Sequence, residues 1–380
     1  MRPTRIQQID LLRFLAAMMV VFFHYGFRGY AGERTEMPYP LLAPVAQYGY
    51  LGVQLFFMIS GFVILMTASH ASLRGFVVSR AVRLYPAFWI CCTLTFLATL
   101  VLGADRFQAT ATQYLLNLTM LGGFLHVKSI DGVYWSLFVE LQFYAFVALL
   151  LVLGQIRRAE TWLVLWLLAT AVIEWLDAGT LRALLITAYS GYFIAGATCY
   201  LIHQHGWSAN RIALIVAAWL HVLYQAAGRI ASFEQVFHVP ISTLIVLAII
   251  TSFFAVMLLV ATRGTSATNA RWVALGALTY PLYLLHQNIG YMAFNALYPA
   301  VNPHVLFWSA IATMLIASHV AHLFLERPLS RRLRYLLDSL LDLLARAWRP
   351  WTTEPSDSSL DISGAREMPG GHDSRSNELR

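Results

Sequence analysis

Long apolar runs separated by short polar segments are the feature that most restricts how this chain can fold. A helix needs about 20 apolar residues to span the hydrocarbon core of a bilayer. About ten runs of that kind follow one another: 9–27, 50–68, 84–103, 133–153, 162–177, 182–202, 212–227, 241–262, 272–297 and 305–325. Only 12% of the residues are charged, which is about half the share in soluble domains. The sequence therefore predicts an all-α integral membrane protein with about ten transmembrane helices.

The arginines and lysines of the connecting segments indicate how these helices are oriented. With the N-terminus placed inside, the inner segments carry ten such residues and the outer loops carry six. Cytoplasmic loops are enriched in Lys and Arg, so we expect both termini in the cytoplasm. The net charge of +7 is scattered singly between apolar runs. It therefore indicates helix orientation and lipid headgroup contacts, and not nucleic-acid binding.

The composition also suggests how the chain is divided. We expect residues 1–335 to form a transmembrane domain and residues 336–380 a cytoplasmic tail. From about residue 351 Ser, Asp, Glu, Gly and Pro dominate, which predicts disorder. The first run resembles a signal peptide, but ionisable residues interrupt it and no cleavage site closes it, so a retained helix is expected. The longest outer loop, 104–132, has room only for a re-entrant or surface element.

The first run contains three ionisable residues, Asp10, Arg13 and His24. Such a residue costs about 2.5–3.5 kcal/mol at the centre of a spanning helix, so all three are candidate functional residues. At 3.6 residues per turn, Arg13 and His24 share one helix face and lie about 16.5 Å apart along the axis, with His24 toward the outer side. A structural interpretation stays open: Asp10 and Arg13 can neutralise each other at i, i+3, and His24 can be a packed histidine.

Six short motifs follow one another between residues 9 and 328. They are Arg13-x10-His24, GVQLFFMISGF from Gly52, SRAVRLYP with Arg80 and Arg83, WSLFVELQFY from Trp135, TYPLYLLH ending at His286, and ERP at 326–328. Together they resemble the membrane acyltransferase-3 family, the multi-pass O-acyltransferases of cell-surface polysaccharides. The likeness is to the stand-alone type, without an SGNH domain. Thr279 and Leu141 stand where the family usually has Ser and Glu.

The resemblance implies that His24 is the catalytic residue and that Arg13 is essential beside it. A neutral imidazole can accept the proton of an acceptor hydroxyl while that hydroxyl attacks a thioester. Alternatively, His24 could accept the acyl group itself. We expect Glu140 at a depth similar to that of His24, where it could orient the imidazole or pair with a buried arginine.

Arg80 and Arg83 are expected at the cytoplasmic mouth of the third run, at i, i+3 on one face. Guanidinium groups suit the phosphates of coenzyme A, although such a pair is also typical of a positive-inside marker. The resemblance favours acyl-donor binding by these two arginines.

Further polar residues of the motifs could line a cavity for the acceptor or for the arm of the donor. The candidates are Asp10, Ser60, Trp135, Ser136, Tyr280, Tyr283 and His286. The same side chains could instead bond helices together, and Trp135 could be an interfacial anchor.

These interpretations define the expected partners. We expect acetyl-CoA or another acyl-CoA as co-substrate, with no permanently bound cofactor, and a carbohydrate or lipid-linked saccharide as acceptor. The histidines show no metal-ligand spacing, so no metal site is expected. The resemblance implies the inner (plasma) membrane of a bacterium. The competing interpretation is a transporter or proton-coupled permease with the same buried Arg, His and Glu, but the sequence shows no internal repeat of the transporter kind.

Overall fold

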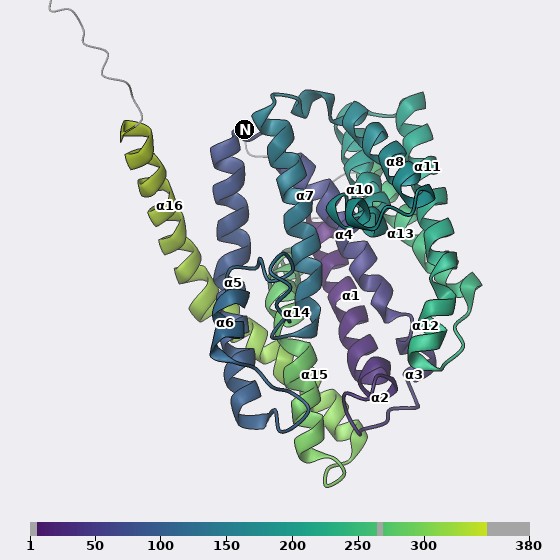
Figure 1. Cartoon of the computed structure of the whole chain (residues 1–380), viewed down its shortest axis with the longest axis vertical. Coiled ribbons are helices and arrows are strands. Elements are labelled where there is room, and N and C mark those ends of the chain that lie inside the picture. The colour runs from purple at the N-terminus through teal and green to yellow at the C-terminus, as the bar shows by residue number, and fades with distance from the viewer. Residues whose placement is uncertain (1–5, 264–268, 348–380) are drawn as a thin grey trace, which may run out of the picture. The chain divides into compact units, whose positions relative to one another are not determined.

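The computed structural model describes residues 6–263 and 269–347, and within these ranges every regular element is helical. The chain groups into two units, Met1–Asp338 and Ser339–Arg380, and all the residues of the candidate site belong to the first. The first unit is a helical bundle (Figure 1), as expected for an all-α membrane protein.

A helix occupies each of the ten predicted runs. These helices are α1 (Gln7–Phe23), α4 (Gly52–Ala68), α5 (Leu73–Leu102), α7 (Trp135–Val152), α8 (Ala159–Trp175), α10 (Thr187–His205), α11 (Ala209–Gly228), α13 (Thr243–Arg263), α14 (Ala270–Leu297) and α15 (Pro303–Val320). Among the described residues, eight helical segments are long and apolar enough to cross a membrane. The other two predicted runs form α8, which has only 17 residues, and α14, which has 28 residues but a polar middle.

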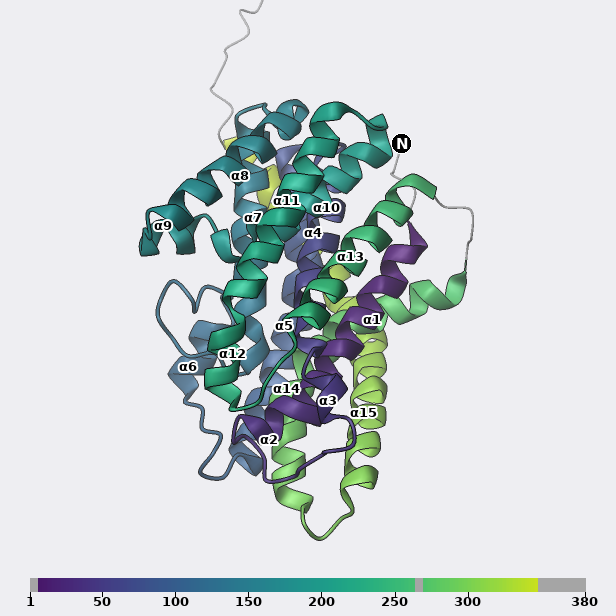
Figure 2. The same ribbon diagram turned by 90° about the vertical axis from the view of Figure 1, so that its right-hand side faces the viewer.

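Short elements join these helices. They are α2 (Gly29–Ala31), α3 (Ala43–Ala46), α6 (Ala111–Asn117), α9 (Gly179–Leu184) and α12 (Ile230–Phe237), together with single 3-10 turns. The two views agree that α2, α3 and α12 lie at the same end of the bundle (Figures 1 and 2). The element expected within the loop 104–132 is α6.

The close approach of α4 and α10 forms the centre of the bundle. An added Cβ at Gly61 of α4 would lie 2.1 Å from the carbonyl oxygen of Phe193, and one at Gly196 of α10 would lie 1.7 Å from that of Met58. Only glycine fits at such backbone contacts, which are typical of helix pairs in membranes. On the other side of the bundle, α1 packs against both α4 and α14, so residues of α1 can line cavities between them.

Two helix boundaries differ from the predicted ones in ways that matter for the site. The helix α5 begins at Leu73, where Ser72 accepts a hydrogen bond from the Gly75 amide at 3.2 Å. Arg80 and Arg83 therefore lie about two and about three turns inside this helix and not at its mouth. The predicted run begins too late, at residue 84, because Arg80 and Arg83 interrupt the apolar pattern before it.

The first helix also changes its winding at the predicted catalytic residue. After Phe23 the chain forms a π-helical turn, His24–Arg28, before α2. Such turns are rare and occur frequently at functional sites. In this turn the half-buried Arg28 lies beside His24, although its place directly after the first apolar run predicts a residue of an outer loop.

The last described helix, α16 (Arg327–Ala347), follows α15 through a second π-helical segment, Ala321–Glu326. It continues through residue 335, so the predicted start of the tail at 336 does not coincide with the end of a helix. The disorder predicted from about residue 351 lies outside the described residues.

Candidate active site

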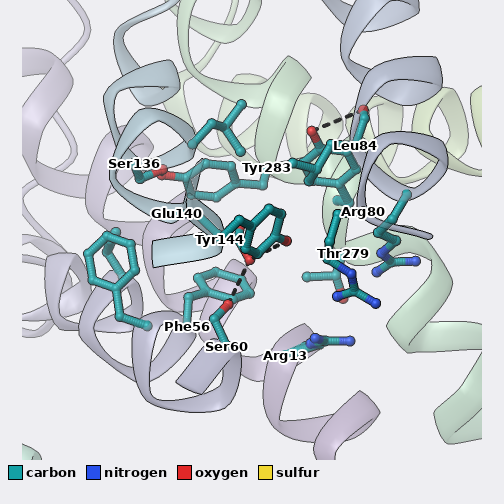
Figure 3. A pocket seen from close by; sticks show the side chains of 15 residues that line it. Arg13, Phe56, Ser60, Arg80, Leu84, Ser136, Glu140, Tyr144, Thr279 and Tyr283 are labelled. Carbon is teal, nitrogen blue, oxygen red and sulfur yellow. Dashed lines mark hydrogen bonds between the residues drawn. The ribbon is translucent and has the colours of Figure 1, made fainter. Parts of the chain in front are cut away.

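Two neighbouring pockets lie in the bundle, and the first is lined by arginines that are far apart in the sequence. Arg13 reaches it from α1, and Arg80 and Arg83 reach it from α5. We call this pocket the arginine chamber. Its lining also includes Val53, Phe56, Phe57, Ser60, Leu84, Ser136, Leu137, Glu140, Tyr144, Thr279, Tyr280 and Tyr283. Arg13 and Arg80 lie on the same side of the chamber (Figure 3), where guanidinium groups could share one anionic ligand.

Arg80 is positioned mainly by aromatic rings. Its guanidinium carbon lies 5.8 Å from the ring centre of Tyr144 and 6.0 Å from that of Phe76, which are cation–π distances. One terminal nitrogen donates to Ser79 Oγ at 3.2 Å. The Nε of Arg80 is buried and has no hydrogen-bond partner among the described residues. The side chain therefore keeps donor capacity that the protein does not use.

Glu140 lies in the arginine chamber. Its Oε1 accepts hydrogen bonds from Ser60 Oγ at 2.8 Å and from the Tyr144 hydroxyl at 2.9 Å, as Figure 3 shows. The contact with His24 that its depth in the membrane suggested is not formed. Depth along the membrane does not fix rotation about the helix axis, and α7 directs this carboxylate toward α4.

The second pocket, the aromatic chamber, has a volume of about 260 Å³. This is slightly below the range of about 300–1,000 Å³ typical of small-molecule sites. Its lining comprises Val20, Phe23, His24, Arg28, Tyr50, Val53, Gln54, Val133, Trp135, Tyr189, Phe233, Phe237 and Tyr283. The rings of Trp135 and Tyr189 lie 5.3 Å apart, and those of Tyr50 and Phe233 also lie 5.3 Å apart.

Hydrogen bonds fix the proton positions on His24. The Nδ1 of His286 lies 3.1 Å from the carbonyl oxygen of Leu282 and 2.9 Å from that of Tyr283, so this nitrogen carries a hydrogen. His286 Nε2 is then an acceptor, and His24 Nδ1 donates to it at 3.0 Å and to the Val20 carbonyl at 2.8 Å. Consequently the lone pair of His24 lies on Nε2.

Arg28 points at that lone pair. Its Nη1 lies 3.2 Å from His24 Nε2 and 3.3 Å from Gln287 Oε1, to which it donates. An arginine near the end of a spanning helix commonly extends toward the headgroups, whereas this side chain is half-buried and lines the aromatic chamber. Sequence reasoning missed this residue, although its spacing of four from His24 was a usable signal.

The two chambers share part of their walls. Val53 and Tyr283 line both of them. The Tyr283 hydroxyl is held by Ser136 Oγ at 2.6 Å and by the Val133 carbonyl at 3.3 Å. A ligand reaching from the arginine chamber to His24 would therefore pass Tyr283.

A buried carboxyl supports the start of α7. Asp131 is fully buried, and its two oxygens accept hydrogen bonds from the Val133 amide at 3.1 Å and the Asn288 amide at 2.9 Å. Burial raises the pKa of this carboxyl to about 7, although the amide hydrogen bonds and the charge of Arg28 act in the opposite direction. Asp131 thereby joins α7 to α14 beside the aromatic chamber.

The remaining predicted residues fall into distinct places. Trp135 is 40% exposed and lines the aromatic chamber. The Tyr280 hydroxyl donates to the Leu84 carbonyl at 3.2 Å in the arginine chamber. Asp10 is buried where α1 packs against Gly276 of α14. Among the described residues, no group of three or more His, Cys, Asp or Glu side chains could hold a metal ion.

Known proteins resemble this chain in sequence. Residues 6–322 match the family described as "Acyltransferase domain". Nodulation protein 10 of Rhizobium leguminosarum bv. viciae is 31% identical over 166 residues, covering 37% of this chain and 43% of that protein. Putative acetyltransferase ORF330 of Acidianus two-tailed virus is 27% identical over 152 residues, covering 40% of this chain and 42% of that protein. The chain thus spans less than half the length of either relative, and no solved structure matches it.

Proposed function

Because this chain belongs to the acyltransferase-3 family of membrane acyltransferases, we propose that it is an O-acyltransferase that uses acyl-CoA. The group transferred is acetyl, in keeping with the name of the viral relative. The acceptor is a hydroxyl of a surface or exported carbohydrate.

The donor binds in the arginine chamber. Coenzyme A carries a pyrophosphate and a 3′-phosphate, and guanidinium groups recognise phosphate oxygens through paired hydrogen bonds. The convergence of Arg13, Arg80 and Arg83 on one pocket supports this assignment, as does the unpartnered Nε of Arg80. The positive-inside rule places the arginine-rich connecting segments in the cytoplasm. The arginine chamber then opens to the cytoplasm, where acyl-CoA is made.

The acceptor binds in the aromatic chamber. Sugar rings present apolar C–H faces and polar hydroxyl edges, which suits aromatic walls with a few hydrogen-bonding groups. The rings of Trp135, Tyr189 and Phe233 supply such walls. The Tyr50 and Tyr189 hydroxyls make no hydrogen bond with any described residue and are available to acceptor hydroxyls.

His24 acts as the general base between the two substrates. Its Nε2 takes the proton of the acceptor hydroxyl as the hydroxyl oxygen attacks the thioester carbon. The tetrahedral intermediate then expels the thiolate of coenzyme A, which receives the proton back from Nε2. His286 accepts the hydrogen bond of His24 Nδ1 and so keeps the lone pair on the reacting nitrogen.

One observation carries this proposal. His24 lines the aromatic chamber, and that chamber shares Val53 and Tyr283 with the arginine chamber. A donor and an acceptor held in these two pockets would meet beside Nε2. This is the arrangement that catalysis by proximity requires.

The test uses the purified protein in lipid vesicles. Coenzyme A should raise its melting temperature, and radiolabelled acetyl from acetyl-CoA should pass to glycans in membranes of a deletion strain. If coenzyme A does not change the melting temperature and no radiolabel passes to the glycans, the proposed function is wrong. If the protein also moved ions or sugars across the vesicle membrane, the transporter interpretation would replace the present one.

A further inference from the structure

We propose that Arg28 is a second catalytic residue, whose guanidinium stabilises the oxyanion formed on the thioester carbonyl during transfer. The inference rests on the proposed acyl transfer and adds a role that His24 cannot perform. A base accepts the proton of the acceptor, but the negative charge on the carbonyl oxygen needs separate donors.

The position of Arg28 matches the place where that charge develops. The attacking hydroxyl must lie within hydrogen-bond reach of His24 Nε2, and Arg28 Nη1 lies 3.2 Å from the same nitrogen. The carbonyl carbon is bonded to the attacking oxygen in the transition state. The carbonyl oxygen therefore forms close to the guanidinium group.

Arg28 also retains the capacity to bind an anion. Both of its acceptors in the structure, His24 Nε2 and Gln287 Oε1, are neutral and are contacted by Nη1. Its other N–H groups make no hydrogen bond with any described residue. Within the described ranges, no carboxylate lies at ion-pair distance from this guanidinium. A half-buried cation of this kind interacts strongly with a new negative charge, because little water screens it.

The step balances in atoms and charge. The acceptor oxygen forms a bond to the thioester carbon, its proton moves to His24 Nε2, and the carbonyl π electrons become the oxyanion. When the hydroxyl of the acceptor substrate donates its hydrogen bond to His24 Nε2, Arg28 no longer donates to that nitrogen. Its N–H groups can then turn to the oxyanion. Collapse restores the carbonyl, breaks the carbon–sulfur bond and returns the proton to the thiolate.

Gln287 holds Arg28 in place. The amide of Gln287 accepts from Arg28 through Oε1 and donates to Asn288 Oδ1 at 3.1 Å. An added Cβ at Gly132 would lie 2.1 Å from Gln287 Nε2, so a larger residue at position 132 would displace this amide from Arg28. Gly132 and Gln287 are therefore positioning residues for Arg28, at the junction of α7 and α14.

The experiment compares Arg28→Gln and Arg28→Lys with wild type in acetyl transfer from acetyl-CoA to glycans of deletion-strain membranes. Both the acetyl-CoA concentration and the amount of acceptor membrane are varied. We expect Arg28→Gln to lower kcat by about 10²–10³-fold, the usual effect of losing an oxyanion donor. The KM for acetyl-CoA should stay unchanged, and Arg28→Lys should recover part of the rate. Arg34→Gln, which removes an exposed arginine from the same end of the bundle, is the matched control and should retain full activity.

The alternative outcomes separate this inference from the proposed function. If the Arg28→Gln variant reaches the wild-type rate when the amount of acceptor membrane is high, Arg28 binds the acceptor and the oxyanion role is wrong. An unchanged kcat also overturns it, provided that His24→Ala is inactive, and the proposed function then stands. If His24→Ala is active as well, the proposed function itself fails. A rise in melting temperature on addition of coenzyme A shows that each variant is folded. Gly132→Ala gives a second test of the inference. This variant should lower kcat although Arg28 itself is unchanged.

Discussion

His286 Nε2 lies 3.0 Å from His24 Nδ1, and this contact joins the middle of α14 to the end of α1. Both rings are buried, and the backbone carbonyls beside His286 fix its own hydrogen on Nδ1. The pair therefore resembles the base and its orienting partner in a hydrolase triad, with a neutral histidine in the place of the carboxylate.

His286→Leu should lower kcat about tenfold to a hundredfold, because one hydrogen bond that fixes the His24 tautomer is lost while the bond to Val20 remains. The KM for acetyl-CoA should not change. His286→Gln keeps an acceptor oxygen and should recover part of the rate. His221→Leu, on α11, is the control for removing a half-buried histidine; an equal loss in that variant would indicate a general packing effect.

Glu140 and His286 should behave as independent residues. Glu140→Gln replaces the carboxylate that accepts hydrogen bonds from Ser60 and Tyr144. His286→Leu instead removes the hydrogen-bond acceptor of His24 Nδ1. Free-energy effects at sites without shared partners add to within about 0.5 kcal/mol. The double variant should therefore show the product of the two single losses in kcat/KM. A double variant no worse than either single one would instead place both residues in one catalytic unit.

Arg80 and Arg83 should serve acetyl-CoA binding more than chemistry. Changing both to Ala should raise the KM for acetyl-CoA at least about tenfold, since charge-assisted hydrogen bonds contribute about 1.5–3 kcal/mol each. The kcat at saturating donor should change far less, because uniform binding energy is lost. Arg157 and Arg158, exposed and outside the chamber, provide a matched double-Ala control. A normal KM in a folded Arg80/Arg83 variant would exclude them from the donor site.

The positions of the ten long helices could be predicted from the sequence, because apolar runs of this length form helices that can span a bilayer, although only eight described segments are long and apolar enough to cross a membrane. His24 and Arg13, predicted as catalytic residues, and Tyr283, predicted as a cavity residue, each line at least one of the two chambers, and their roles stay predictions. Rotation about a helix axis could not be predicted, since it depends on packing against neighbours. For that reason depth alone predicts Glu140 beside His24, whereas the structure places it in the arginine chamber.

Arg28 and Asp131 show a second limit of sequence reasoning. Both stand at the ends of apolar runs, where charged residues usually face water or headgroups. The π-helical turn at His24–Arg28 and the fully buried position of Asp131 bring them inside. Neither feature follows from local composition, because Arg28 and Asp131 find their hydrogen-bond partners Gln287 and Asn288 on the distant helix α14.

Asp131 should make stability depend on pH. Its pKa is raised by burial from 3.8 to about 7, so the folded protein binds a proton more tightly than the unfolded chain. This contribution to stability is complete below about pH 4 and is lost as pH rises through about 7. The melting temperature should therefore fall between pH 5 and about 8, and Asp131→Asn should flatten that slope. An identical slope in the variant would show that other groups cause the dependence.

The central claim is that His24 performs the chemistry between two substrate chambers. The most direct measurement is acetyl transfer by His24→Ala in vesicles, alongside its coenzyme A–induced rise in melting temperature. The account predicts that transfer falls to background while the thermal shift by coenzyme A stays as in wild type, because the arginine chamber is intact. Transfer at a rate near wild type by this variant would contradict the account.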